Sequence, residues 1–223
     1  MKITYKKLFR NLPFTSAVRF SFLLLVKKLF ANEANLFFSQ TGEDLILKSI
    51  LGHKSNGFYV DVGCNKPYYL SNTFYLYLNG WRGICIDANE KLCSAFKRSR
   101  PRDTVITAAV SDIEKDVTFY VSDDVPAVST IDANQYEEWK KHWQFTREVR
   151  IRTRRLEQIL DENIVTSTSI DLLSVDVEGH DFEALRSINL ARYRPRLIVV
   201  EMHGFGLTQM IQDPICNYLQ AFD

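Results

Sequence analysis

Three ionisable side chains stand at two-residue intervals directly after an apolar segment of the chain. Asp176, Glu178 and His180 follow residues 170–175, whose composition is typical of a strand buried on both faces. Gly179 breaks the strand, so we expect His180 to turn toward the same crevice as Asp176. Crowded carboxylates should have raised, coupled pKa values, and histidine is a usable base at neutral pH. This spacing predicts general acid–base chemistry, with a divalent metal on the carboxylates as a second option.

The element that must position a ligand beside these groups is predicted over residues 57–89, as a strand, a loop, a helix and a second strand. Residues 58–62 form a β-type apolar run that contains Asp61, a charge that a buried strand does not ordinarily carry. Gly63 allows the chain to turn tightly and approach a ligand closely. Asp87 ends the second strand, where an acid is well placed to accept hydrogen bonds from a ribose diol.

The loop after Gly63 narrows the choice of nucleotide. It contains one glycine and a proline, whereas a dinucleotide-binding turn has the pattern G-x-G-x-x-G to hold a pyrophosphate. S-adenosylmethionine has a ribose diol and no phosphate, so this loop favours a methyltransferase over a nicotinamide-dependent oxidoreductase. A plain α/β unit with a partly exposed Asp87 is the alternative for this motif taken alone.

Two further predicted strands also end in polar residues. Ser111 and Asp112 follow the third strand, and Glu201 and His203 follow the last one. The carboxyl ends of strands line the ligand crevice in a doubly wound sheet, so we expect all of these groups at one edge. Asp112 could accept from an adenine amino group, or Ser111 and Asp112 could simply form a turn. Asp176 as a cap and Glu178 on the surface are the corresponding structural alternatives.

The order of several motifs resembles the FkbM family of S-adenosylmethionine-dependent methyltransferases. The matching stretches are SQTGEDLIL (39–47), GFYVDVGCNKPYYLSNTFYLYLNGWRGICIDAN (57–89), RPRDTVITAAVSD (100–112), STID (129–132), IDLLSVDVEGHDFEALRSI (170–188) and RPRLIVVE (194–201). One departure concerns the cofactor: the family usually has a glutamate at the position of Asp87, often with a proline soon after it. Asp87 is one methylene shorter, which reduces its reach toward a ribose.

The resemblance implies an α/β fold with a Rossmann-like, doubly wound, mostly parallel sheet of the class I methyltransferase type. It implies methyl transfer from S-adenosylmethionine to a hydroxyl of a carbohydrate or small molecule; the alternative is a non-catalytic binding module of the same fold. The residues expected to act in catalysis are Asp176, Glu178 and His180. The residues expected to bind the cofactor are Gln40, Asp61, Gly63, Asn72, Asp87, Ala88, Ser111 and Asp112.

Composition favours one globular domain of ordinary character. The chain has 223 residues, of which 46% are hydrophobic and 25% charged, so disorder is not expected. The net charge of +1 gives no overall field that would attract nucleic acid. The four cysteines lack metal-site spacing, and reduced thiols in a cytoplasmic protein explain them. We expect a segment over 1–35 and a methyltransferase domain over 36–223.

Residues 1–30 differ from the rest of the chain in charge. They contain seven lysines and arginines, and the first acid is Glu33. The apolar run 22–26 is too short to span a bilayer. Two interpretations remain open: a basic amphipathic helix resting on an anionic membrane surface, or a helix packed on the domain with its lysines in water. We expect a chain that starts near residue 31 to keep cofactor binding.

An insertion over about 116–155 interrupts the alternation of strands and helices. It predicts two strands around a helix that carries Tyr136, Trp139 and Trp143 on one face. This insertion could cover the acceptor pocket and stack its aromatic rings on sugars, or bury those rings on the sheet. The sequence after His203 predicts one helix over 214–222 and leaves too little chain for the last two strands of the usual methyltransferase sheet. Two expectations follow: either the chain is a fragment, or the sheet edge is incomplete.

Overall fold

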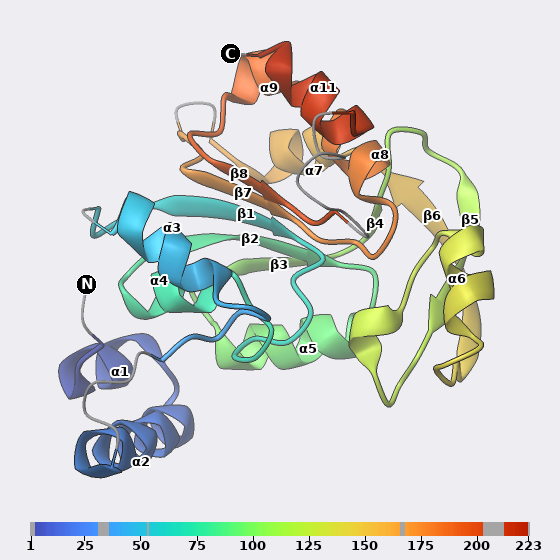
Figure 1. Ribbon diagram of the computed structural model, residues 1–223. Helices are drawn as coiled ribbons and strands as arrows, with labels where there is room; N and C mark the ends of the chain where they lie inside the picture. Colours follow the sequence, from blue (N-terminus) through green and yellow to red (C-terminus); the bar gives the residue numbers. More distant parts are fainter. Residues whose placement is uncertain (1–2, 31–35, 53, 166–167, 203–211, 223) are drawn as a thin grey trace.

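The computed structural model describes residues 3–30, 36–52, 54–165, 168–202 and 212–222, and it has a parallel sheet at its centre (Figure 1). The strands are β1 (Phe58–Val62), β2 (Arg82–Asp87), β3 (Thr104–Thr107), β7 (Leu172–Val175) and β8 (Ile198–Val200). Their order is β3-β2-β1-β7-β8, and each neighbouring pair is parallel. The strand order reverses between β1 and β7, so the predicted doubly wound α/β fold is confirmed.

Helices cover both faces of this sheet because the strands are apolar on both sides. One face packs against α3 (Glu43–Leu51), α4 (Phe74–Leu78) and α5 (Glu90–Ser99). The other face packs against α7 (Leu156–Asn163), α8 (Asp181–Arg186), α9 (Leu190–Tyr193) and α11 (Pro214–Gln220). The helix predicted over 214–222 corresponds to α11. The two layers of helices leave the carboxyl ends of the strands as the open edge of the sheet.

The predicted insertion, together with residues 109–110, forms a second, three-stranded sheet beside those carboxyl ends (Figure 1). Its strands are β4 (Ala109–Val110), β6 (Arg147–Arg154) and β5 (Asp116–Val121), in that order. The third strand expected from the sequence is therefore divided: β3 pairs with β2, and β4 leaves the central sheet to pair with β6. A 3-10 turn at Pro126–Val128 and helix α6 (Ala133–Trp139) connect β5 to β6.

Helix α6 is shorter than the aromatic spacing suggests. It ends at Trp139, so Trp143 lies beyond the helix, with 45% of its surface exposed. Tyr136 stacks on Tyr120 of β5 with ring centroids 3.8 Å apart, and Phe145 packs edge-on against Tyr136. Packing against the strand thus accounts for Tyr136, as in the second of the two interpretations.

The N-terminal region forms two helices, α1 (Tyr5–Asn11) and α2 (Phe14–Phe30), separated at Pro13. Leu8 of α1 is fully buried in a cluster with Phe74 and Tyr77 of α4. Asn11 donates a hydrogen bond to the Leu78 carbonyl at 2.8 Å. The helix packed on the domain is therefore the correct description of α1. Among the described helices, none has both the length and the apolar character that crossing a bilayer requires.

Candidate active site

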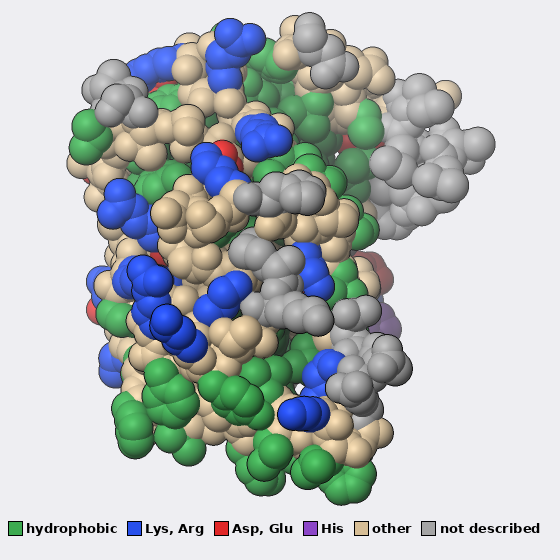
Figure 2. Space-filling model, turned by 90° about the vertical axis from the view of Figure 1, so that its left-hand side faces the viewer, with side chains coloured by type: hydrophobic (Ala, Val, Ile, Leu, Met, Phe, Trp, Pro, Cys, Tyr) green, Lys and Arg blue, Asp and Glu red, His purple; other side chains and the backbone are tan. Residues whose placement is uncertain are grey.

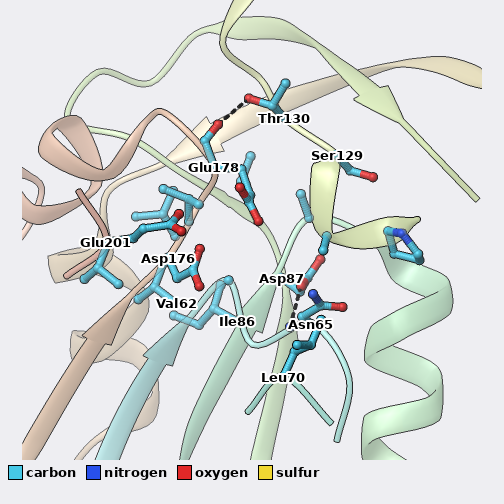
Figure 3. A pocket seen from close by; sticks show the side chains of 18 of the residues that line it. Val62, Asn65, Leu70, Ile86, Asp87, Ser129, Thr130, Asp176, Glu178 and Glu201 are labelled. Atoms are coloured by element: carbon cyan, nitrogen blue, oxygen red, sulfur yellow. Dashed lines mark hydrogen bonds between the residues drawn. The ribbon is translucent and has the colours of Figure 1, made fainter. Parts of the chain in front are cut away.

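A pocket opens across the carboxyl ends of β1, β2, β7 and β8, at the place where the strand order reverses. Its floor consists of strand-end residues, among them Val62, Ile86, Val175 and Val200. Figure 3 shows Asp87 and Asn65 at one end of this pocket and three carboxylates at the other. In doubly wound sheets ligands bind in this crevice. The topology thus brings together groups that lie more than a hundred residues apart in the sequence.

Asp87 lines one end of the pocket from the tip of β2, where the sequence places it. Its two carboxylate oxygens accept hydrogen bonds from the backbone N–H groups of Asn65, at 2.9 Å, and Asn89, at 2.8 Å. Burial raises the pKa of Asp87 to about 6, against the opposing effect of these two N–H groups. Each oxygen of an ionised carboxylate can accept more than one hydrogen bond. Asp87 therefore has acceptor capacity left for the hydroxyls of a diol.

Asp176, Glu178 and Glu201 form a carboxylate cluster at the opposite end. One oxygen of each lies within 4.8 Å of the others, and their side chains point toward one another in Figure 3. Burial and then the charges of Glu201 and Glu178 hold the pKa of Asp176 well above its usual range. Burial, Glu201 and Asp181 raise the pKa of Glu178 to about 8. The raised pKa makes the Glu178 carboxylate a stronger base than an ordinary glutamate, and the three side chains also offer oxygen ligands of the kind that divalent cations prefer.

The turn that carries Glu178 is held in an uncommon backbone conformation. Glu178 has a φ of 58° and Gly179 a φ of 93°, both in the left-handed region. The buried Asp181 carboxylate accepts from the backbone N–H of Val177 at 2.8 Å and of Gly179 at 3.1 Å. The Thr130 hydroxyl donates to the Glu178 carbonyl at 2.8 Å (Figure 3). Contacts from α8 and from the insertion therefore fix the position of the Glu178 backbone.

Gly63 is required by the contact between two strand ends. Its φ is +81°, and a Cβ placed on it would lie 1.6 Å from the carbonyl oxygen of Asp176. The backbone N–H of Asp176 donates to the Val62 carbonyl at 2.9 Å, which holds the two strand ends at this separation. Gly63 lines the pocket as expected. The close approach that it permits is to the Asp176 backbone.

The structure divides the residues expected from the sequence into two groups. Seven of them line the pocket: Gln40, Gly63, Asn72, Asp87, Ala88, Asp176 and Glu178. Four others have their side chains in neighbouring contacts and are not among the lining residues: Asp61, Ser111, Asp112 and His180. His203 lies outside the described residues.

Asp61 belongs to a buried polar network beneath the pocket. The Thr73 hydroxyl donates to the Asp61 carboxylate at 2.5 Å, and Arg100 donates to the same Thr73 oxygen at 3.1 Å. Arg100 is fully buried and is also paired with Asp103 at 2.7 Å. Burial raises the pKa of Asp61. This network explains why a core strand contains a carboxylate, and it gives Asp61 a role in positioning the loop above it.

His180 lies in a contact between β4 and α8 instead of the pocket. Gly179 does turn the chain, but His180 becomes the residue that precedes α8, and its Nε2 lies 2.9 Å from the Ser111 hydroxyl. Its Nδ1 is 3.6 Å from Glu183. Burial lowers the pKa of His180. Asp112 pairs with Arg186 of α8, so Ser111, Asp112 and His180 together join the end of β4 to that helix.

Sequence reasoning did not assign the residues that cover the pocket. The segment between β5 and α6 contributes most of this roof, whose lining residues are Phe119, Pro126, Ala127, Ser129, Thr130 and Ile131. The insertion therefore lines this pocket, but Trp139 and Trp143 are not among the lining residues, and whether the pocket takes the acceptor stays a prediction. The STID stretch, 129–132, was the available signal, because it matched the family pattern and had no assigned role. Asn65 and Leu70, from the loop after β1, were also missed.

Comparison with known proteins gives one match. The family model described as Methyltransferase FkbM domain matches residues 61–222. This range covers most of the chain and contains every pocket-lining residue except Gln40 and Glu43. No match was found among curated proteins or among solved structures.

Proposed function

The chain belongs to the FkbM methyltransferase family, and from this premise we propose that it transfers a methyl group from S-adenosylmethionine to a hydroxyl oxygen of a carbohydrate or small molecule. One observation carries the proposal. The pocket has an acceptor of diol hydrogen bonds, Asp87, at one end and a proton-accepting cluster, Asp176 with Glu178 and Glu201, at the other. A nucleoside ligand needs an acceptor for its ribose hydroxyls, and a hydroxyl substrate needs a base for its proton.

The residues at the cofactor end suit an adenosine group without phosphates. Asp87 would bind the ribose hydroxyls, and the small side chains of Ala88 and Ala109 with Ile86 offer an apolar surface to the base. The loop after β1 has no run of glycines to hold a pyrophosphate. Asp112 is paired with Arg186, so it is not the group that we propose for the adenine. When bound, S-adenosylmethionine supplies an electrophilic methyl group on a sulfonium.

The carboxylate cluster would remove the proton of the acceptor hydroxyl. A hydroxyl has a pKa far above 7, and its proton must leave as the new carbon–oxygen bond forms. A carboxylate whose pKa is raised to about 8 is a stronger base than an ordinary glutamate. Glu178 is therefore the base that we propose, with the carboxylates of Asp176 and Glu201 beside it. A divalent cation on the same three oxygens would instead acidify the hydroxyl.

Calorimetric titration with S-adenosylmethionine and its demethylated product tests the first half of the proposal. We expect both to bind, and NADH not to bind; failure of both adenosyl ligands would refute it. Transfer of labelled methyl groups to a panel of glycans and small alcohols tests the second half. Cofactor binding without methyl transfer to any acceptor of the panel would favour the non-catalytic binding module. Loss of transfer with a chelator alone would assign proton removal to a metal.

A further inference from the structure

Helix α2 has two apolar faces, and the domain uses only one of them. Ala17, Phe20 and Leu24 face the domain and belong to the cluster around Phe74. The ring of Phe20 lies 5.3 Å from that of Phe74 and 6.0 Å from that of Phe38. A helix that rests on a protein surface normally presents polar residues to water on its opposite side. The opposite side of α2 does not follow this rule.

The second face of α2 is an exposed stripe of large apolar side chains. Its members follow one another at intervals of three or four residues and so lie on one side of the helix: Phe14, Val18, Phe22, Leu25 and Leu29. Phe22 and Leu29 are 68% and 66% exposed. Phe9 of α1 is also exposed and its ring lies 6.0 Å from that of Phe14, so the stripe continues onto α1. Figure 2 shows hydrophobic side chains gathered at this lower end of the molecule.

The charged residues of α1 and α2 are all basic. The first 32 residues contain seven lysines and arginines and no acid. Since the whole chain has a net charge of +1, the residues after them carry a net charge of −6. Exposed Lys6, Arg10, Arg19 and Lys28 lie on the two helices that carry the stripe. Exposed apolar side chains bordered by basic ones are typical of helices that lie in the interface of an anionic membrane.

Charge also argues against a second copy of the chain as the partner. A symmetric dimer through this face would place two basic helices against each other, and like charges across an interface are unfavourable. We propose that the exposed face of α1 and α2 docks on an anionic lipid surface, with the stripe inserted at the boundary between headgroups and acyl chains. The domain would then be held at the membrane peripherally, through packing of Phe20 and Leu8 on its core.

Vesicle flotation of the full chain tests this proposal. We expect it to float with phosphatidylcholine vesicles that contain phosphatidylglycerol. Its binding to vesicles of pure phosphatidylcholine should be at least about tenfold weaker. The double variant Phe22→Glu/Leu29→Glu should stay at the bottom of the gradient. The matched control Ile113→Glu/Val165→Glu changes two apolar residues that are 59% and 74% exposed elsewhere, and it should float like the wild type. Circular dichroism checks that both variants are folded.

A second pair of variants separates charge from apolar contact. Arg19→Gln/Lys28→Gln should lower binding to the anionic vesicles about thirtyfold. About 1 M salt, where charges are screened within about 3 Å, should lower it at least as much. Wild-type protein that does not float, or a Phe22→Glu/Leu29→Glu variant that floats unchanged, would overturn the proposal. A third result would also overturn it: no vesicle binding by the wild type, with light scattering that shows a dimer which Phe22→Glu/Leu29→Glu abolishes.

Discussion

Asp87 has both backbone hydrogen bonds on its carboxylate and remaining acceptor capacity toward the pocket. We predict that Asp87→Ala weakens binding of the demethylated cofactor by about 1.5–3 kcal/mol, the usual value of a hydrogen bond to a charged group. Calorimetry measures this loss. Asp112→Ala is the matched control, because Asp112 is paired with Arg186 and should leave affinity unchanged. The opposite pattern would return the cofactor assignment to the end of β4.

The raised pKa of Asp87 adds a pH dependence to the same experiment. Its carboxylate is ionised above pH of about 6 and protonated below it. Protonation removes acceptor sites for the ribose hydroxyls, so affinity should fall as the pH drops through that value. In Asp87→Ala the affinity should be nearly flat over this range. A wild-type affinity that does not change between pH 5 and pH 7, taken as roughly one unit on each side, would contradict the assignment.

Glu178 should be needed for turnover while making the fold less stable. We predict that Glu178→Gln lowers the rate of methyl transfer about 10²-fold or more. Its folded-state pKa of about 8 lies above the ordinary glutamate value. The folded chain therefore binds this proton more tightly, and stability falls as the pH rises from about 4 to about 8. Gln removes that penalty, so urea unfolding at pH 8 with a chelator present should show a gain of up to about 5 kcal/mol.

Comparing the turnover of His180→Ala with that of Glu178→Gln shows which of the two side chains acts as the base. His180 contacts Ser111 and Glu183, so its loss should lower turnover much less than Glu178→Gln does. A larger effect of His180→Ala would restore the imidazole as the base that the sequence suggested. Both measurements need an acceptor that the transfer screen has identified.

Residue positions at strand ends were predictable, whereas side-chain partners were not. Asp87, Asp176 and Glu178 follow apolar strands, and topology alone brings strand ends together. The partners of Asp61 and His180 depend on packing between distant segments. Arg100, which lies beneath Asp61, looks in the sequence like any basic residue at the end of a surface helix. Local pattern contains no signal for such a contact.

At the scale of elements, the ends of β1 and β7 can meet only because Gly63 has no Cβ atom. We predict that Gly63→Ala destabilises the fold by about 3 kcal/mol or more, because its Cβ would overlap the Asp176 carbonyl and its φ is left-handed. Gly42→Ala is a matched control. Its φ of +100° is also left-handed, but the nearest atom to an added Cβ is 4.0 Å away, so a cost of about 1 kcal/mol is expected. Denaturant unfolding of both variants measures the difference, and equal losses would refute the contact argument.

The strands of the insertion were visible in the sequence, but their pairing was not. Val117, Phe119 and Val121 alternate as expected for β5, and the opposite strand alternates with arginines. The sequence contains no local sign that this strand divides into β3 and β4, because the run of residues 105–110 is uninterrupted. The strand divides because its two parts pair with different strands: residues up to Thr107 pair with β2, and Val110 pairs with β6. Such a choice is made by tertiary pairing, which propensity does not encode.

At the scale of the molecule, α1 packs on the core, and the expectation that a chain starting near residue 31 keeps cofactor binding stays a prediction. Leu8 is fully buried against α4. We predict that Leu8→Ala lowers the free energy of unfolding by about 2–5 kcal/mol. Phe9→Ala, at the exposed neighbouring position, should change it little. A chain starting at residue 31 would expose the ring of Phe74 and should unfold at lower urea; unchanged stability of Leu8→Ala would contradict this.

The N-terminal region was ambiguous in the sequence for a physical reason. The same alternation of apolar and basic residues suits a helix against protein and a helix against lipid, because both surfaces are apolar. Only the position of Phe20 against Phe38 and Phe74 decides which side of α2 is already occupied. The central sheet was far less ambiguous, because its strands are apolar on both faces and alternate with helices.

The hydrogen bond from Thr130 to the Glu178 carbonyl ties the roof of the pocket to the turn that presents the proposed base. The floor, by contrast, is made where the backbones of β1 and β7 meet. An engineer who wishes to change the acceptor therefore has a separable part to work with: the segment between β5 and α6 can be exchanged while the floor stays intact. Any exchanged segment must keep a donor at position 130, since otherwise the new specificity would come with a misplaced base.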